Sequence, residues 1–159
     1  ERGAGLIVVY NKMDRVGDER SARRRLERLA HEALAFAPWV PVTFTSAKTG
    51  HGTAALLDRI LAVAQARRTR VTTGELNRFF QTVLDAHPPP SARGRLVRLY
   101  YVTQAGVAPP TFMISTNRPA EVHASYQRYV TNQIRAAFGF EGSPIRVHYR
   151  GKRRSSSRR

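Results

Sequence analysis

The residues Asn11-Lys12-Met13-Asp14 form a polar cluster directly after an apolar run at residues 6–10 (LIVVY), and this junction decides the fold of the first part of the chain. The run is rich in β-branched side chains and does not alternate with polar residues, which is typical of a buried strand in a parallel sheet. Open α/β sheets bind their ligands at the carboxyl ends of such strands. The sequence therefore predicts a ligand-binding loop at Asn11-Lys12-Met13-Asp14.

A second polar loop, Ser46-Ala47-Lys48, follows another strand-like run at residues 42–45 (VTFT). Between the two runs, residues 18–37 carry apolar side chains at helical spacing, and Pro38 should end this helix. Thr53 can cap a further helix. The order strand, helix, strand, helix predicts a βαβα unit, with both loops at one edge of its sheet.

Together the two loops carry side chains that suit a guanine base. The carboxylate of Asp14 can accept hydrogen bonds from the ring N–H and the exocyclic amino group, an arrangement that adenine does not offer. The stems of Lys12 and Lys48 can cover the two faces of the base, and Asn11 can tie the loops together. A backbone N–H of the second loop can donate to the guanine carbonyl. We therefore predict that guanine binds at Asn11, Lys12, Asp14, Ser46, Ala47 and Lys48.

An NKxD motif after one strand, then a helix, then a strand followed by SAK resembles the base-reading half of the Ras-like, translation-factor-related GTPases. The alternative interpretation of Asn11-Lys12-Met13-Asp14 is a polar loop that binds no ligand. The sequence contains no GxxxxGK[ST] phosphate loop. The resemblance therefore implies GTP as ligand, with Mg²⁺ ligands and switch loops upstream of Glu1. We expect no catalytic residue and no metal site in these 159 residues, which alone should neither hydrolyse GTP nor bind it tightly.

The second part of the chain predicts an α-β-β-α-β domain at residues 70–150. Thr72 and Glu75 form a capping box ahead of an amphipathic helix. Strands are expected at residues 96–102 and 111–116, joined as an antiparallel hairpin, and a second helix should end at Gly139. Alternating residues at 145–150 predict a third strand. Two helices packed on one face of a three-stranded sheet are typical of KH-like RNA-binding folds.

Several stretches of this part resemble the C-terminal domain of the Der (EngA) family of bacterial ribosome-assembly GTPases. They are residues 87–90 (HPPP), 100–104 (YYVTQ), 109–112 (PPTF) and 132–146 (NQIRAAFGFEGSPIR). The resemblance runs from about Leu6 to Arg150. It implies the end of the second of two tandem GTPase domains at residues 1–69, then the whole KH-like domain at 70–150. It also implies action in the cytoplasm on the large ribosomal subunit, with the KH-like domain contacting rRNA.

The residues Gly139-Phe140-Glu141-Gly142 match the GxxG pattern of KH domains, but we predict that they only end the preceding helix. In KH domains that loop joins two helices and grips nucleotides. Here it should join a helix to a strand, and Glu141 stands where a phosphate would approach. RNA contact would therefore need other surfaces.

The net charge of +16 favours a polyanionic partner. Residues 1–69 have a net charge of +5, whereas residues 70–159 have +11, with a basic tail at 151–159 that should be disordered in isolation. We predict RNA contacts at Arg93, Arg95, Lys152, Arg153 and Arg154. A solvated basic surface without a partner is the alternative.

Other features narrow the choice of function. The chain has no cysteine, no metal-ligand spacing among its five histidines and no apolar run long enough for a membrane span. Two further hypotheses stay open: a non-catalytic RNA-binding module in which the GTPase part is only scaffold, and a KH-bearing GTPase of the Era type. The Era type requires a working GxxG loop between two helices, which the sequence does not predict.

Overall fold

The computed structural model describes residues 3–17 and 19–151, and these form two compact units. The first unit contains the described residues up to Thr69 together with the segment Phe140–Pro144. The second unit contains Arg70–Gly139 and the described residues from Ile145 onward. The units are therefore not consecutive in the chain, because a segment between the last helix and the last strand belongs to the first unit.

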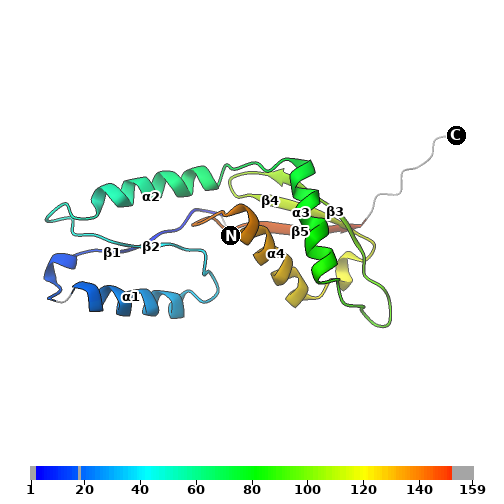
Figure 1. Ribbon diagram of the computed structural model, residues 1–159, viewed down its shortest axis with the longest axis horizontal. Coiled ribbons are helices and arrows are strands. Elements are labelled where there is room, and N and C mark those ends of the chain that lie inside the picture. Colours follow the sequence, from blue (N-terminus) through cyan, green and yellow to red (C-terminus); the bar gives the residue numbers. More distant parts are fainter. Residues whose placement is uncertain (1–2, 18, 152–159) are drawn as a thin grey trace. The chain divides into compact units, whose positions relative to one another are not determined.

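The first unit is built on two parallel strands, β1 (Val8–Tyr10) and β2 (Val42–Phe44). The chain passes from β1 through the short 3-10 helix η1 (Met13–Arg15) into α1 (Glu19–Ala33), and α2 (Thr53–Ala66) follows β2. Figure 1 shows α1 and α2 on opposite sides of the strand pair. The predicted βαβα order and the parallel pairing are confirmed.

Three details of the first unit differ from the prediction. Gly52 and not Thr53 is the N-cap of α2, because Thr53 is the first helical residue and its hydroxyl donates to the carbonyl of Gly50 at 2.7 Å. The helix α1 ends at Ala33 rather than at residue 37, because Pro38 disfavours helical backbone before it and the N–H of Ala37 closes a turn onto the carbonyl of Leu34 at 2.7 Å. The strand β1 is not buried, since Val9 is 40% exposed. Among the described residues, β2 is the only strand that pairs with β1.

The segment Phe140–Pro144 joins the first unit through backbone hydrogen bonds. The N–H of Leu6, just before β1, donates to the carbonyl of Gly142 at 2.7 Å, and the N–H of Gly142 donates to the carbonyl of Trp39 at 2.8 Å. Gly142 has a φ of +67°, and a Cβ at this position would lie 2.4 Å from Cγ2 of Val63 on α2. Only glycine fits there without displacing α2.

A salt bridge fixes the same segment. Nη1 of Arg59 on α2 lies 3.0 Å and 3.1 Å from the two carboxylate oxygens of Glu141. The helix α4 stops directly before this segment, at Phe138, and Gly139 has a φ of +82°. This geometry is consistent with the prediction that residues 139–142 end the helix. The carboxylate of Glu141 forms a salt bridge with Arg59.

The second unit has the predicted α-β-β-α-β order. Its elements are α3 (Thr73–Ala86), β3 (Leu99–Gly106), β4 (Thr111–Thr116), the short 3-10 helix η2 (Pro119–Glu121), α4 (Ala124–Phe138) and β5 (Arg146–Gly151). The strand β4 is central, antiparallel to β3 and parallel to β5. Because β5 runs parallel to β4, its connection must cross the sheet, and α4 makes that crossing.

The core of the second unit lies between one face of this sheet and its two helices. The side chains of Val102, Phe112 and Ile114 from the sheet are fully buried, as are those of Leu76 on α3 and Val130 on α4. Figure 1 shows α3 and α4 on the same side of the sheet. The helix α3 begins as predicted, because the Thr72 hydroxyl accepts a hydrogen bond from the N–H of Glu75 at 3.3 Å.

The strand β3 lies further along the chain than predicted, at Leu99–Gly106 instead of residues 96–102. Gln104, expected in a turn, is 7% exposed, and its side-chain oxygen accepts a hydrogen bond from the N–H of Val71 at 2.8 Å. Backbone pairing with β4, of Gln104 with Phe112 and of Gly106 with Thr111, extends the strand. The hydrogen bond to Val71 joins residues 33 apart, so local sequence patterns do not predict it. Among the described residues, no helix has the length and apolar character needed to cross a membrane.

Candidate functional site

The two predicted polar loops meet at the carboxyl ends of β1 and β2. The N–H of Thr45 donates to the carbonyl of Tyr10 at 2.9 Å, and the N–H of Met13 donates to the carbonyl of Thr45 at 3.1 Å. Met13 is 5% exposed, so its side chain anchors η1 in the unit, away from solvent. Backbone hydrogen bonds between the two chain segments thus continue past the ends of β1 and β2, and they bring the two loops side by side.

Asn11 ties the loops together, as the sequence predicts. Its side-chain oxygen Oδ1 accepts a hydrogen bond from the backbone N–H of Ala47 at 3.0 Å. The hydroxyl of Thr45 lies 3.4 Å from the same oxygen. Because the donors lie in the second loop and directly before it, Asn11 fixes the separation of the loops.

Asp14 and Ser46 form a second link between the loops. The hydroxyl of Ser46 donates to Oδ1 of Asp14 at 2.5 Å. Ser46 is only 1% exposed, whereas the Asp14 carboxylate is open to solvent. The hydrogen bond from Ser46, with smaller contributions from its own N–H and the positive charges of Lys48 and Arg15, holds the pKa of Asp14 below its usual range. The carboxylate is therefore ionised and presents an acceptor at the loop surface.

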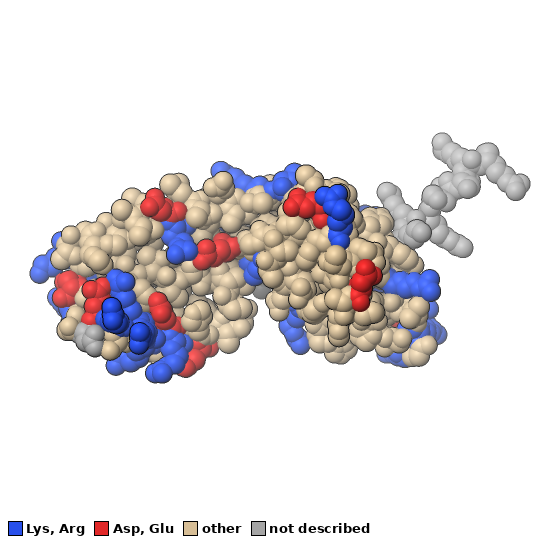
Figure 2. Space-filling view, in the orientation of Figure 1, with Lys and Arg blue, Asp and Glu red and all other residues tan. Residues whose placement is uncertain are grey.

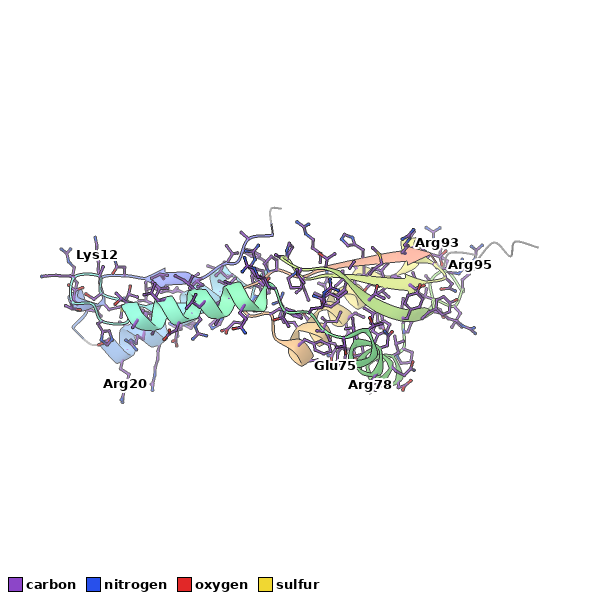
Figure 3. All side chains as sticks on the ribbon, turned by 90° about the horizontal axis from the view of Figure 1, so that it is seen from above. Lys12, Arg20, Glu75, Arg78, Arg93 and Arg95 are labelled. Atoms are coloured by element: carbon purple, nitrogen blue, oxygen red, sulfur yellow. The ribbon has the colours of Figure 1, made fainter. Side chains whose placement is uncertain are left out.

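The two lysines flank this carboxylate on exposed backbone. Lys12 has a φ of +67°, a left-handed conformation that is uncommon outside glycine, and it is exposed to solvent. Figure 3 shows Lys12 at the end of the first unit, where the β1 loop lies. The charge of Lys48 reaches Asp14 from the other loop. The structure therefore brings all six predicted residues to one edge of the strand pair.

The turn after Lys48 is held against β2 by close packing. The N–H of Ser46 donates to the carbonyl of His51 at 2.9 Å. Gly52 has a φ of +72°, and a Cβ there would lie 2.3 Å from the carbonyl oxygen of Phe44. Glycine is needed at this position, because any side chain would push the turn off the strand and move Ser46 with it.

Three residues that support the site were not identified from the sequence. Thr45 contributes its carbonyl and hydroxyl, as described above. His51 connects the second loop to α1, since its Nε2 lies 3.2 Å from Nη2 of Arg23. Arg23 also lies over the Phe44 ring, 5.4 Å from its centroid. None of these contacts follows a short-range sequence pattern, because the partners lie 28 or more residues apart or on different elements.

The predicted RNA-contacting residues are only partly described. Arg93 and Arg95 lie on an exposed turn before β3, in which Ala92 and Arg95 exchange backbone hydrogen bonds of 2.9 Å. Figure 3 shows both arginines together at one end of the β3–β4–β5 sheet. Lys152, Arg153 and Arg154 lie outside the described residues.

The helix α1 carries five arginines and three glutamates, so its surface charge is mixed. Figure 2 shows blue and red side chains intermixed on this helix. Arg23 forms an ion pair with Glu19, and Arg28 lies 3.9 Å from Glu32. No group of three or more His, Asp or Glu side chains within residues 3–17 and 19–151 could hold a metal ion.

Comparison with known proteins gives consistent similarities over nearly the whole chain. A family model described as "KH-domain-like of EngA bacterial GTPase enzymes, C-terminal" matches residues 70–150. A protein named GTPase Der from Moorella thermoacetica is 45% identical over 150 residues, which cover 94% of this chain and 34% of that protein. Proteins of the same name from Desulfitobacterium hafniense and Thermomicrobium roseum are each 42% identical, over 96% of this chain and 34% of theirs. The chain thus spans about a third of the length of these relatives.

Proposed function

The chain belongs to the family of EngA bacterial GTPases, and on this premise we propose that its first unit is the guanine-recognising part of a GTPase domain. The observation that supports this proposal is the pairing of Asp14 with Ser46 and of Asn11 with Ala47 at one sheet edge. An ionised carboxylate held between two loops is the acceptor that guanine requires for its ring N–H and amino group. Adenine presents no such pair of donors.

Each of the six residues then has a defined role. Asp14 accepts from the base, Ser46 orients Asp14, and the stems of Lys12 and Lys48 lie against the faces of the base. The N–H of Ala47 donates to Asn11 in this structure, at 3.0 Å. On binding, the guanine carbonyl would share or take over this N–H, while Asn11 keeps the loops at the distance that the base needs.

In this proposal the groups that bind the phosphates of GTP lie in the remainder of a longer protein, together with the ligands of Mg²⁺. The relatives named GTPase Der are about three times as long as this chain. The first unit also exposes large apolar side chains, including Phe36 at 81%, Leu61 at 67% and Leu57 at 62%. An upstream part of the GTPase domain would cover such surface. The 159 residues alone would then bind GTP weakly and not hydrolyse it.

The nucleotide assignment is tested by Asp14→Asn in the complete protein. An amide at this position presents a donor where guanine presents its amino group, but it suits the second carbonyl of xanthine. The variant should lose affinity for GTP and gain affinity for xanthosine triphosphate, measured by competition against a fluorescent nucleotide. Arg15→Gln, on the same turn, is the control and should keep the preference for GTP. An unchanged GTP preference in Asp14→Asn would refute the role of Asp14.

We also propose that the complete protein acts in the cytoplasm in assembly of the large ribosomal subunit, where the second unit contacts rRNA. This proposal rests on the family and on the net charge of +11 at residues 70–159. Arg93 and Arg95, exposed on one turn, are its candidate contacts among the described residues.

Co-sedimentation of the complete protein with large-subunit precursors, in the presence of a non-hydrolysable GTP analogue, tests this assignment. Binding that depends on nucleotide supports a GTPase whose nucleotide state controls rRNA contact. Equal binding with and without nucleotide would favour the non-catalytic RNA-binding module instead.

A further inference from the structure

The sheet of the second unit has one face that no helix of the unit covers. The helices α3 and α4 both lie on the other side of the sheet, and Figure 3 shows Glu75 and Arg78 of α3 on that side. Residues paired across a sheet project to the same face, and successive residues alternate between faces. The register therefore tells which side chains lie on the uncovered face.

Two rows of paired residues define this face. Tyr101, Ser115 and Arg150 form one row across the three strands, and Thr103, Met113 and His148 form the next. A third pair, Thr111 and Arg146, lies beyond them. The buried residues Val102, Phe112 and Ile114 occupy the alternate positions, which confirms that the two rows face away from the core. We call this set of residues the open sheet face.

The open sheet face combines an exposed aromatic ring with positive charge. Tyr101 is 49% exposed, and Arg146, His148 and Arg150 are exposed along β5. Alternate residues of a strand are separated by about 6.6 Å, so Arg146 and Arg150 lie about 13 Å apart on this edge. That length suits the two or three unstacked nucleotides that open sheets bind through aromatic side chains.

No acidic residue lies on β3, β4 or β5. The described acidic residues of the second unit lie elsewhere: Glu75 and Asp85 are on α3, and Glu121 on η2 is paired with Arg118 at 3.2 Å. The strands themselves therefore place no carboxylate beside a phosphate backbone on the open sheet face, and Glu121 on η2, the element that contacts β5, is already paired with Arg118. This charge distribution favours a polyanion on the open sheet face over one on the helical side.

Ser115 adds a polar group in the middle of the same face. It is 5% exposed, and its Oγ has no hydrogen-bond partner among the described residues. Buried hydroxyls in folded proteins are nearly always hydrogen-bonded. Its register neighbours are Tyr101 and Arg150, so a nucleotide between these two side chains would bring a ribose or base group toward this hydroxyl.

The loop that KH domains use to grip nucleotides is engaged differently here. Glu141 at its centre is paired with Arg59 at 3.0 Å, and Gly142 makes backbone hydrogen bonds with Leu6 and Trp39 of the first unit. The N–H of Gly142 already donates to the carbonyl of Trp39, so it is not available to a phosphate. The carboxylate of Glu141 in the same loop would repel a phosphate. RNA contact by the second unit therefore requires another surface.

We propose that the open sheet face binds single-stranded RNA, with a base stacked on Tyr101 and phosphates on Arg146 and Arg150. This inference rests on the proposed function, in which the second unit contacts rRNA, and specifies where and in what form. Stacking on an aromatic ring requires an unpaired base, so single strands are bound in preference to duplexes.

The test measures binding of the complete protein to a fluorescein-labelled 12-nucleotide oligouridylate, by fluorescence anisotropy over a series of salt concentrations. Tyr101→Ala should weaken binding by roughly tenfold, the usual effect of losing one stacked base, and Tyr101→Phe should retain it. Arg150→Gln should weaken binding and lower the slope of log K against log salt by about 0.7, the value for one phosphate of a single strand. Arg78→Gln, an exposed arginine on α3, is the matched control and should change neither.

The outcomes separate this inference from the proposed function. If wild-type protein binds the oligouridylate but Tyr101→Ala and Arg150→Gln match Arg78→Gln, RNA contacts another surface, and only the assignment to the open sheet face is overturned. The same holds if a 12-base-pair RNA duplex binds more tightly than the single strand. If wild-type protein binds neither RNA nor ribosomal precursors, both the inference and the proposed rRNA contact are wrong. An unchanged midpoint of urea unfolding in each variant verifies that the second unit is folded.

Discussion

The hydroxyl of Ser46 donates a hydrogen bond to the carboxylate of Asp14 across 2.5 Å, joining residues from two loops that follow neighbouring strands. This bond is the largest cause of the lowered pKa of Asp14. In Ser46→Ala the pKa of Asp14 should rise toward its ordinary value. A pH titration of the Asp14 side-chain carbonyl carbon by NMR measures this directly. An unchanged pKa would show that Ser46 does not stabilise the ionised form.

The same bond has a predictable effect on stability. Since folding lowers the pKa of Asp14, the stabilisation is complete above the unfolded pKa near 3.9 and is lost as the pH falls through the lower, folded pKa. The difference in free energy of unfolding between wild type and Ser46→Ala should therefore be constant above about pH 5 and shrink below about pH 4. Denaturant titrations at several pH values measure this difference. A difference that grows as the pH falls would contradict the assigned sign.

Asn77 on α3 should be a major stabilising residue of the second unit. Its side chain accepts from the N–H of Val102 at 3.0 Å and donates to the carbonyl of Val102 at 2.8 Å, which closes the outer edge of β3. Asn77→Ala leaves both groups unpaired and should cost about 2–4 kcal/mol. Asn77→Asp keeps the acceptor for the N–H and should slow exchange of the Val102 amide relative to Asn77→Ala. Equal hydrogen-exchange rates in the two variants would refute the role of this pair.

Gly142→Ala should loosen the first unit. The added methyl group would lie 2.4 Å from Val63 and 3.0 Å from the carbonyl oxygen of Leu6, on a backbone with φ of +67°. We expect a loss of roughly 2–4 kcal/mol from overpacking and backbone strain, seen as faster exchange of the Leu6 amide. Gly50→Ala is the control: its φ is +77°, but no atom lies within 4 Å of the new methyl group. It should cost only the strain, about 1–2 kcal/mol.

Thr72→Ala should destabilise α3 by about 1 kcal/mol, because it removes the cap on the N–H of Glu75. Thr72→Ser retains the hydroxyl and should behave like wild type. Thr73→Ala, one residue into the helix, has no capping role and serves as the control. Urea denaturation followed through hydrogen exchange of the α3 amides gives the three free energies. A Thr73→Ala effect as large as that of Thr72→Ala would show that the cap contributes little.

Local sequence patterns were sufficient for most elements of this chain. The α3 cap, the alternating residues of β5 and the end of α4 at Gly139 follow from side-chain chemistry within a few residues. The loops around Asn11 and Ser46 were also predictable, since polar residues after apolar strands mark the edge of a parallel sheet. Their direct hydrogen bonds support that prediction of proximity, while guanine binding itself stays a prediction.

The features that the sequence did not reveal depend on contacts between distant residues. The extension of β3 depends on its pairing with β4 as far as Thr111, and the connection of the second loop to α1 depends on Arg23 and His51. The open sheet face was predictable only in part. The alternation of Arg146, His148 and Arg150 was visible in the sequence, but its alignment with Tyr101 required the strand register.

The place of Phe140–Pro144 in the first unit has a practical consequence for anyone who wishes to dissect the molecule. A cut after Thr69 would strip the N-terminal piece of five residues that complete it, leaving Leu6 and Trp39 without their partner at Gly142. A truncation meant to delete only the second unit would thus also damage the first unit, to which we assign guanine recognition. Loss of GTP affinity after such a deletion would reflect an incomplete fold and would not by itself demonstrate communication between the two halves.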